Sequence, residues 1–209
     1  MVQMHVGRDE AFEIAVSVLA IALVFTFYDS GLSVTPSVFL FSMAAAVITL
    51  GSGFLLHEMA HQYYAIKYGA RAQFKAWPAG LALALALVVV PQIFGMQPLF
   101  FIAPGAVYIY AMRRISVREN GIISLAGPAM NWVVGFIFLA VASLFAGNNI
   151  IFAIAMLGYR INFSLALFNL IPIFPLDGSK VLAWDWKVWL ASALFTLACL
   201  FVLPSVLLG

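Results

Sequence analysis

Long apolar runs separated by short polar segments dominate the chain, and they predict a helical membrane protein. Runs near the roughly 17–25 residues that a membrane-crossing helix needs cover residues 11–28, 121–146, 150–171 and 188–208. A further run over residues 37–66 exceeds one crossing, which predicts a helix that is tilted or projects beyond the bilayer. The pattern therefore favours an all-α polytopic fold with about six transmembrane or re-entrant helices.

The region between residues 67 and 112 has a less regular pattern. Residues 70–77 could be extended, and the apolar run over residues 79–94 is so short that it either crosses the membrane or is re-entrant. Prolines interrupt residues 95–112, which argues against one regular helix, and residues 107–110 are strand formers. We therefore predict a small membrane-associated β-like hairpin or loop that returns the chain to the side it left.

The basic residues support this path. If residues 79–112 enter and return, nearly all Lys and Arg residues fall on one side, and the turns on the other side carry none. The positive-inside rule makes the basic side cytoplasmic. The basic residues concerned are Arg8, Lys67, Arg71, Lys75, Arg113, Arg114, Arg118, Lys180 and Lys187.

Composition strengthens the membrane assignment and excludes other classes. The chain is 65% hydrophobic and 9% charged, whereas soluble domains are about 45–50% apolar and about 25% charged. We expect one membrane-embedded domain over residues 1–209. The net charge of +2 and the scattered basic residues predict no nucleic-acid partner. The N-terminal residues do not resemble a cleavable signal, which is compatible with a prokaryotic plasma membrane.

One polar cluster interrupts the run over residues 37–66. His57 and His61 are four residues apart, so on a helix they share one face, a spacing that suits two imidazoles on one Zn²⁺. Glu58 lies beside them and completes an HExxH motif. This motif also occurs by chance in proteins that bind no zinc. A charge at the centre of a membrane helix costs about 2.5–3.5 kcal/mol, so three titratable side chains here indicate a compensating metal.

A catalytic zinc ion usually takes three protein ligands and keeps one position for water. The third ligand must be another His, Asp or Glu at the same depth. His5 is in the polar leader, Glu119 and Asp185 are in charged patches, and Asp29 is on the opposite side. Asp177 remains, after two prolines and on the cytoplasmic side, near which we also expect His57 and His61. It could instead cap a helix, and both roles can coexist because a carboxylate has two oxygens.

Glu58 and the remaining polar residues of the apolar runs are candidates for roles in catalysis or in structure. Glu58 is the candidate general base that takes a proton from a water activated by zinc, and we expect one zinc ion per chain. Asn131 has two interpretations. It either forms a hydrogen bond with a neighbouring helix, which would contribute about 0.6–2 kcal/mol to stability, or it donates a hydrogen bond to a substrate carbonyl or oxyanion. Asn162 and Asn169 have the same alternatives, with structure favoured. Arg160 could pair with a carboxylate or snorkel.

Three separated motifs resemble the site-2 protease family of intramembrane zinc metalloproteases, also called peptidase family M50. They are His57-Glu58-x-x-His61, Ala126-Gly127-Pro128-x-x-Asn131, and the segment Asn169-Leu170-Ile171-Pro172-x-x-Pro175-Leu176-Asp177-Gly178. Their order and spacing make the resemblance specific. It covers residues 37–185 and indicates a minimal member without a PDZ module.

The resemblance implies an enzyme that hydrolyses peptide bonds in or beside transmembrane segments of other membrane proteins, such as single-span proteins. It makes His57, His61 and Asp177 the zinc ligands, Glu58 the catalytic base and Asn131 a substrate-positioning residue. The family's strand-like segment, thought to present an extended substrate, would correspond to residues 70–78 or 100–112. The second of these, around Pro104 to Val107, is the better match.

Two other functions use the same residues. A membrane transporter or channel could use the ligand cluster as a transit site, but it would be expected to show ligands on a path open to both sides and repeated halves, and neither is evident. A non-catalytic scaffold is disfavoured because Glu58 and all three proposed ligands occur together.

Overall fold

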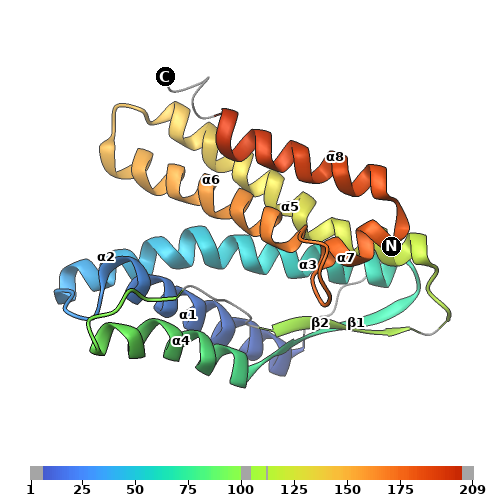
Figure 1. Cartoon of the computed structure of the whole chain (residues 1–209), viewed down its shortest axis with the longest axis horizontal. Coiled ribbons are helices and arrows are strands. Elements are labelled where there is room, and N and C mark those ends of the chain that lie inside the picture. Colours follow the sequence, from blue (N-terminus) through green and yellow to red (C-terminus); the bar gives the residue numbers. More distant parts are fainter. Residues whose placement is uncertain (1–6, 100–104, 112, 204–209) are drawn as a thin grey trace.

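The computed structural model describes residues 7–99, 105–111 and 113–203. Most of them lie in helices, and a two-stranded sheet lies at one end of the molecule (Figure 1). The elements in chain order are α1 (Arg8–Ser30), α2 (Pro36–Ala46), the π-helical segment η1 (Val47–Gly51), α3 (Ser52–Lys67), β1 (Ala70–Ala76), α4 (Pro78–Ile93), β2 (Gly105–Ala111), α5 (Val117–Leu144), α6 (Asn149–Asn169), α7 (Asp177–Trp184), α8 (Trp186–Leu197) and the π-helical segment η2 (Ala198–Val202).

Within the described residues, four helical stretches are long and apolar enough to cross a membrane: Arg8–Ser30, Pro36–Lys67, Val117–Leu144 and Asn149–Asn169. Two further apolar helices, Pro78–Ile93 and Trp186–Val202, are shorter. The predicted all-α polytopic fold is confirmed. At about 1.5 Å per residue α4 is about 24 Å long, which is less than the roughly 30 Å of a hydrocarbon core.

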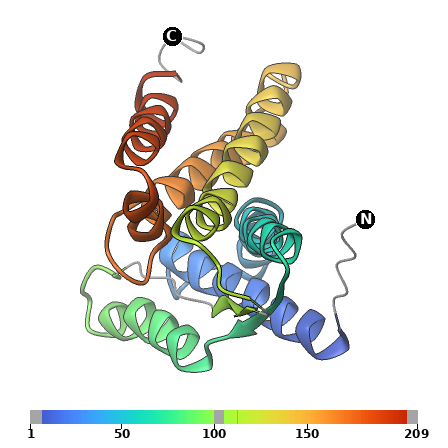
Figure 2. The same cartoon turned by 90° about the vertical axis from the view of Figure 1, so that its right-hand side faces the viewer.

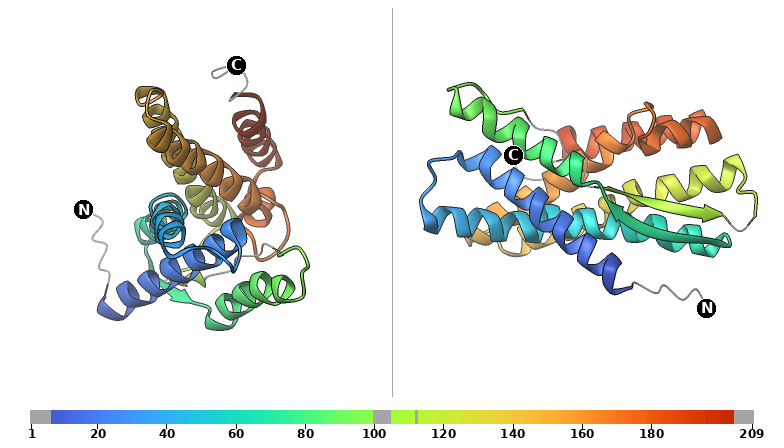
Figure 3. Two further views of the ribbon diagram at one scale, coloured as in Figure 1. Left: turned by 90° about the vertical axis from the view of Figure 1, so that its left-hand side faces the viewer. Right: turned by 90° about the horizontal axis from the view of Figure 1, so that it is seen from below.

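The long second helix is continuous, as its apolar run predicts: α2, η1 and α3 follow one another without a break over 32 residues. In Figure 2, α3 and α5 lie in the middle of the bundle, with α1 and α4 on one side and α8 on the other. Seen from below, α1 crosses this long helix obliquely, and the sheet lies beside the C-terminal part of α3 (Figure 3).

Glycines allow α5 and α6 to pack closely. A Cβ atom on Gly135 would lie 2.6 Å from the ring of Phe163, and one on Gly158 would lie 2.6 Å from the ring of Phe138. Small residues at such positions let helix backbones approach in a membrane, where dispersion contacts drive association. The helices α5 and α6 thus form a closely packed pair, and the chain leaves this pair at the C-terminal end of α6 to enter α7.

The strands β1 and β2 form an antiparallel pair. Its register runs from Ala70 opposite Ala111 to Ala76 opposite Gly105. The chain therefore leaves α3, passes through β1 and α4, and comes back along β2 to the end from which it started. The predicted extended segment at residues 70–77 and the predicted return are both confirmed, whereas Pro104 lies outside the described residues.

The outer edge of β1 is closed by carboxylates from α1. Glu10, only 3% exposed, accepts a hydrogen bond from the backbone N–H of Phe74, at 2.8 Å. Glu13 accepts one from the backbone N–H of Ala76, also at 2.8 Å. These bonds occupy donors of a strand edge that would otherwise be open. The helix begins at Arg8, so residues 8–10 belong to α1 and not to the polar leader expected from the sequence.

Two helices begin earlier than their apolar runs because polar side chains cap them. Ser116 Oγ accepts from the backbone N–H of Glu119, whose carboxylate accepts from the backbone N–H of Ser116, a capping box that starts α5. Asp185 accepts from two backbone N–H groups of the first turn of α8. This helix therefore begins before the predicted run over residues 188–208, and residues 204–208 of that run lie outside the described part.

Candidate metal centre

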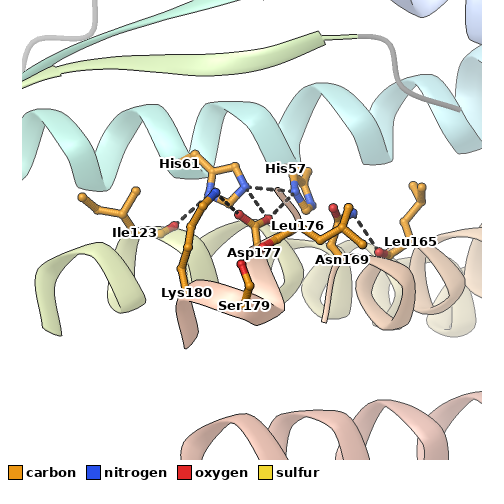
Figure 4. A network of polar contacts seen from close by, with 9 residues as sticks. All are labelled: His57, His61, Ile123, Leu165, Asn169, Leu176, Asp177, Ser179 and Lys180. Carbon is orange, nitrogen blue, oxygen red and sulfur yellow. Dashed lines mark hydrogen bonds and ion pairs between the residues drawn. The ribbon is translucent and has the colours of Figure 1, made fainter. Parts of the chain in front are cut away.

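The two histidines of the HExxH motif lie one turn apart on α3, and both are buried, with His57 5% and His61 8% exposed. Their Nε2 atoms are 3.0 Å apart, and both face α5 and α7 in Figure 4. The spacing of the motif thus gives the shared helix face that it predicts. Two ring nitrogens that face each other at this distance, away from water, are well placed to share one cation.

Asp177 comes to this pair from a distant part of the sequence. Its Oδ2 lies 3.4 Å from Nε2 of His57 and 3.0 Å from Nε2 of His61. The N-cap of α7 is Leu176, and Asp177 is the first helical residue, without a capping hydrogen bond in this helix. The alternative that Asp177 caps a helix is therefore wrong, and its carboxylate faces the histidines instead.

These three side chains fit a zinc ion. One donor atom from each lies within 4.8 Å of the others, and all three residues are buried. Ligand atoms at about 2.0–2.2 Å from a tetrahedral zinc ion are roughly 3.3–3.6 Å apart, and the separations here are 3.0–3.4 Å. Two imidazoles and one carboxylate are also a donor set that catalytic zinc sites use.

A glycine of α5 leaves room beside this group. A Cβ atom on Gly127 would lie 2.5 Å from Nε2 of both His57 and His61, closer than side-chain atoms come to one another. The cradle is therefore open only because residue 127 has no side chain. The sequence places Gly127 in a motif but does not predict its role, because nothing local to α5 indicates which helix Gly127 faces.

The polar surroundings orient one of the two histidines and keep the carboxylate ionised. His61 donates from Nδ1 to the backbone carbonyl of Ile123, at 2.7 Å, which leaves the Nε2 lone pair free for a metal. Nδ1 of His57 is buried without a hydrogen-bond partner among the described residues. Burial raises the pKa of the Asp177 carboxyl, but His61 and His57 in their protonated form outweigh burial by charge and hydrogen bonding and hold that pKa below its ordinary value. A bound cation would take the place of those protons. The carboxylate therefore stays in the ionised form that metals bind.

Two further residues fix Asp177 in place. A Cβ atom on Gly178 would collide with the backbone carbonyl of Leu170, so the glycine lets the start of α7 lie directly on the end of α6. Lys180 Nζ lies 3.4 Å from Oδ1 of Asp177, on the oxygen that does not face the histidines. The sequence predicts no contact with Asp177 for Gly178 or Lys180, although both follow Asp177 within three positions.

Glu58 lies beside the three donors but does not join them. It lines the same cavity as His57 and His61, and its carboxylate makes no hydrogen bond or ion pair with other described residues. Its oxygens therefore remain available to water and to a substrate.

The three donor residues His57, His61 and Asp177 border one cavity of about 960 Å³, together with Glu58. Its lining comes from α1, α3, the ends of both strands, α5, α6 and α7, and it is mostly apolar. Asn131 lines it as well, fully buried, and neither its Oδ1 nor its Nδ2 has a hydrogen-bond partner among the described residues. The alternative that Asn131 bonds a neighbouring helix is therefore wrong.

The polar residues of α6 differ from Asn131, which lies on α5. Asn162 donates from Nδ2 to the carbonyl of Gly158, and Asn169 donates to the carbonyl of Leu165. Both side chains therefore bond within their own helix, and the expected hydrogen bond to a neighbouring helix is not found among the described residues. Arg160 is exposed and lines the cavity.

Three known proteins resemble the chain in sequence. It is 40% identical over 183 residues to the provisionally named zinc metalloprotease MJ0611 of Methanocaldococcus jannaschii, with 88% of each chain covered. It is 30% identical over 155 residues to the provisionally named zinc metalloprotease YwhC of Bacillus subtilis, covering 67% of this chain and 68% of the relative. Zinc metalloprotease MJ0392 of Methanocaldococcus jannaschii is 27% identical over 143 residues, which are 66% of this chain and 33% of that protein. No family model and no solved structure matches the chain.

Proposed function

Because the chain belongs to a family of zinc metalloproteases, we propose that it is an intramembrane endopeptidase of the site-2 protease type. It hydrolyses peptide bonds in or near transmembrane segments of other membrane proteins. One observation carries the proposal. The donors of His57, His61 and Asp177 converge in an apolar cavity among helices of membrane-crossing length, where a soluble protease would have an open polar cleft.

The residues of the cavity divide the chemistry among them. His57, His61 and Asp177 would hold the zinc ion, which would supply Lewis-acid chemistry by acidifying a water molecule and polarising a carbonyl group. The Glu58 carboxylate takes a proton from the attacking water as its oxygen bonds to the peptide carbon. Glu58 then gives that proton to the amide nitrogen as the carbon–nitrogen bond breaks.

Asn131 positions the peptide that is cut. Its buried amide has unused donor and acceptor atoms and lines the cavity. A substrate backbone carbonyl would supply the missing acceptor, and the oxyanion that develops there is stabilised by the same N–H donors.

The sheet supports an extended substrate. Carboxylates of α1 occupy the outer edge of β1, whereas no described residue bonds the outer edge of β2. Three β2 residues, Gly105, Val107 and Tyr108, line the cavity. A substrate segment that adds to β2 as a strand would unwind from its helix, which opens its peptide bonds to attack.

The placement of charge supports an orientation with the active site near the cytoplasmic face of a prokaryotic plasma membrane. The start of α1, the end of α3, the start of α5 and α7 lie at the same end of the molecule (Figure 1). Basic residues concentrate in these segments, and the positive-inside rule places them in the cytoplasm.

The proposal is tested with the purified, zinc-loaded protein and a single-span model polypeptide in liposomes. We expect cleavage within or beside the span by the wild type. Glu58→Gln keeps the zinc ion and loses about 10²–10⁴-fold in rate, the usual contribution of a general base. Asp29→Asn, which removes an exposed carboxylate outside the metal-containing cavity, serves as the matched control and keeps full activity.

Two results would contradict the proposal. One is equal cleavage by the wild type and Glu58→Gln, which removes the base from the mechanism. The other is zinc flux through the liposome membrane without cleavage of any polypeptide, which favours a transporter.

A further inference from the structure

Among the described residues, three Lys and Arg residues line the cavity, and one of them has no partner within the same part of the chain. Lys75 Nζ lies 3.1 Å from Oε1 of Glu13, and Lys180 Nζ lies 3.4 Å from Oδ1 of Asp177. The Arg160 side chain forms no ion pair or hydrogen bond within the described residues. An arginine side chain keeps its charge in proteins and carries five N–H donors. Within the described part of the chain, Arg160 is therefore the cationic group of this cavity that is free to bind an anion.

This cation lies far from both ends of its helix. Arg160 is 11 residues after the start of α6 and 9 residues before its end, which places it about 14 Å or more from either end along the axis. A charged residue at such depth is costly, and by default it marks a functional site with a partner. A lipid phosphate at the headgroup level is a poor partner because of this depth.

The position of Arg160 relative to the metal centre follows from helix packing. A Cβ atom on Gly53 of α3 would collide with Oδ1 of Asn162 of α6, so these residues lie at the same level of two helices that run in the same direction (Figure 1). His57 is four residues after Gly53, and Arg160 is two residues before Asn162. The two are therefore separated by about 9 Å along the helices, with Arg160 on the side of η1.

We propose that Arg160 forms a subsite for acidic residues in this cavity and binds an Asp or Glu side chain in the membrane segment of the substrate. An extended peptide advances about 3.3 Å per residue. The acidic residue therefore lies about three residues from the scissile bond, on the side that faces η1 and the interior of the membrane. This inference rests on the proposed function and adds a substrate class to it.

Such a subsite would give selectivity that an apolar cavity lacks. Apolar walls accept any apolar membrane segment, and one methylene more or less changes binding little. A segment without an acidic residue would leave the Arg160 guanidinium unpaired against apolar side chains, and a site built for a polar partner rejects ligands that lack it. Ordinary spans rarely carry acidic residues, so they are discriminated against.

Binding tests the subsite separately from cleavage. The protein carries Glu58→Gln and zinc, and it is placed in neutral-lipid nanodiscs with a Leu- and Ala-rich membrane-spanning peptide that has one Glu or, in a matched peptide, one Gln. We expect about tenfold tighter binding of the Glu peptide, as for a hydrogen bond to a charged group. Arg160→Gln brings the ratio of the two dissociation constants to about one. Arg160→Glu should bind a third peptide, which carries Lys at the same position, more tightly than it binds the Glu peptide.

Arg118→Gln is the matched control, because Arg118 is also exposed but does not line the cavity. This variant keeps the preference for the Glu peptide. The inference is overturned by a Glu-to-Gln ratio that is the same with Arg or Gln at position 160. It is also overturned if Arg160→Gln changes binding only in nanodiscs that contain phosphatidylglycerol, which assigns the arginine to lipid phosphate.

Cleavage by the protein with Glu58 restored then separates this inference from the proposed function. If the subsite is correct, moving the Glu along the peptide moves the cut bond with it, at a spacing of about three residues. Cleavage at a bond that does not follow the Glu contradicts the subsite but leaves the protease intact. Tighter binding of the Glu peptide without cleavage of any peptide supports the subsite and contradicts the protease.

Discussion

Two glycines that offer no ligand atom decide whether the three donors can meet. Gly127 leaves the space beside the two Nε2 atoms open, and Gly178 lets the residue after Asp177 lie against the carbonyl of Leu170. At both positions a single methyl group would fall within contact of backbone or ligand atoms. The site therefore requires the absence of a side chain at these two positions as strictly as it requires the three ligands.

Gly127→Ala should lose zinc and cleavage together, because its Cβ atom would lie 2.5 Å from both ring nitrogens and would push them apart. We expect at least a 10-fold weaker zinc affinity, comparable to the loss of a supporting contact around a metal site. Zinc per chain is measured by elemental analysis. Gly147→Ala is the control, since a Cβ atom there meets nothing within 4 Å. Full zinc content in Gly127→Ala would contradict the geometry.

Asn131→Leu separates a substrate role from a structural one. The Asn131 amide is fully buried without partners among the described residues, so an apolar side chain of similar size should leave the unfolding temperature unchanged or raise it. Cleavage should fall by about 10²-fold with zinc retained, as when an oxyanion donor is removed. A lower unfolding temperature with unchanged cleavage would make Asn131 a structural residue.

The spacing of His57, Glu58 and His61 predicted a shared helix face, and elimination by depth and side predicted Asp177. The steric role of Gly127 could not be predicted, because it depends on which face of α5 lies against α3. The free amide of Asn131 could not be predicted either, since a lone Asn in an apolar run is compatible with both alternatives that the sequence leaves open.

At the scale of elements, α1 fixes the sheet relative to the motif helix. Glu10 accepts a hydrogen bond at 2.8 Å from Nε2 of Gln62, the residue after His61, in addition to the one from Phe74. Gln62 also donates to the carbonyl of Ala72. One buried carboxylate thus joins α1, α3 and β1, and it keeps the outer edge of β1 closed.

Glu10→Ala should loosen this junction. Hydrogen bonds to a charged group contribute about 1.5–3 kcal/mol, so amide hydrogen exchange of β1 should accelerate by about 10–100-fold while zinc remains bound. Exchange is followed by mass spectrometry on peptides from β1 and α5. Glu10→Gln keeps one acceptor oxygen and should show a smaller effect. Unchanged β1 exchange, or equal acceleration in α5, would contradict a local role.

Residue preferences and prolines predicted the two extended segments and the return of the chain. The partners of the sheet edge were not predictable, because Glu10 and Phe74 are 64 positions apart and the acidic residues near the N-terminus look like an ordinary solvated leader. Their carboxylates enter the fold because strand donors are available to them there.

At the scale of the whole molecule, the arrangement of helices produces one apolar cavity that includes the metal-binding group. Composition and the asymmetry of basic residues predicted a polytopic protein with its motif near one membrane face. The cavity of about 960 Å³ was not predictable, because its walls come from helices and strands distant in sequence. Metal chemistry and substrate selection share this space, so a change in either should affect cleavage.

The central claim is that one zinc ion, held by His57, His61 and Asp177, enables the chain to cut peptides within a membrane. The most direct test removes zinc with a chelator, restores it in steps and measures both bound zinc and cleavage of a single-span polypeptide in liposomes. We predict that cleavage is absent without zinc, rises in proportion to bound zinc and reaches its maximum at one ion per chain. Cleavage by the zinc-free protein, or a maximum at any other ratio, would contradict the claim.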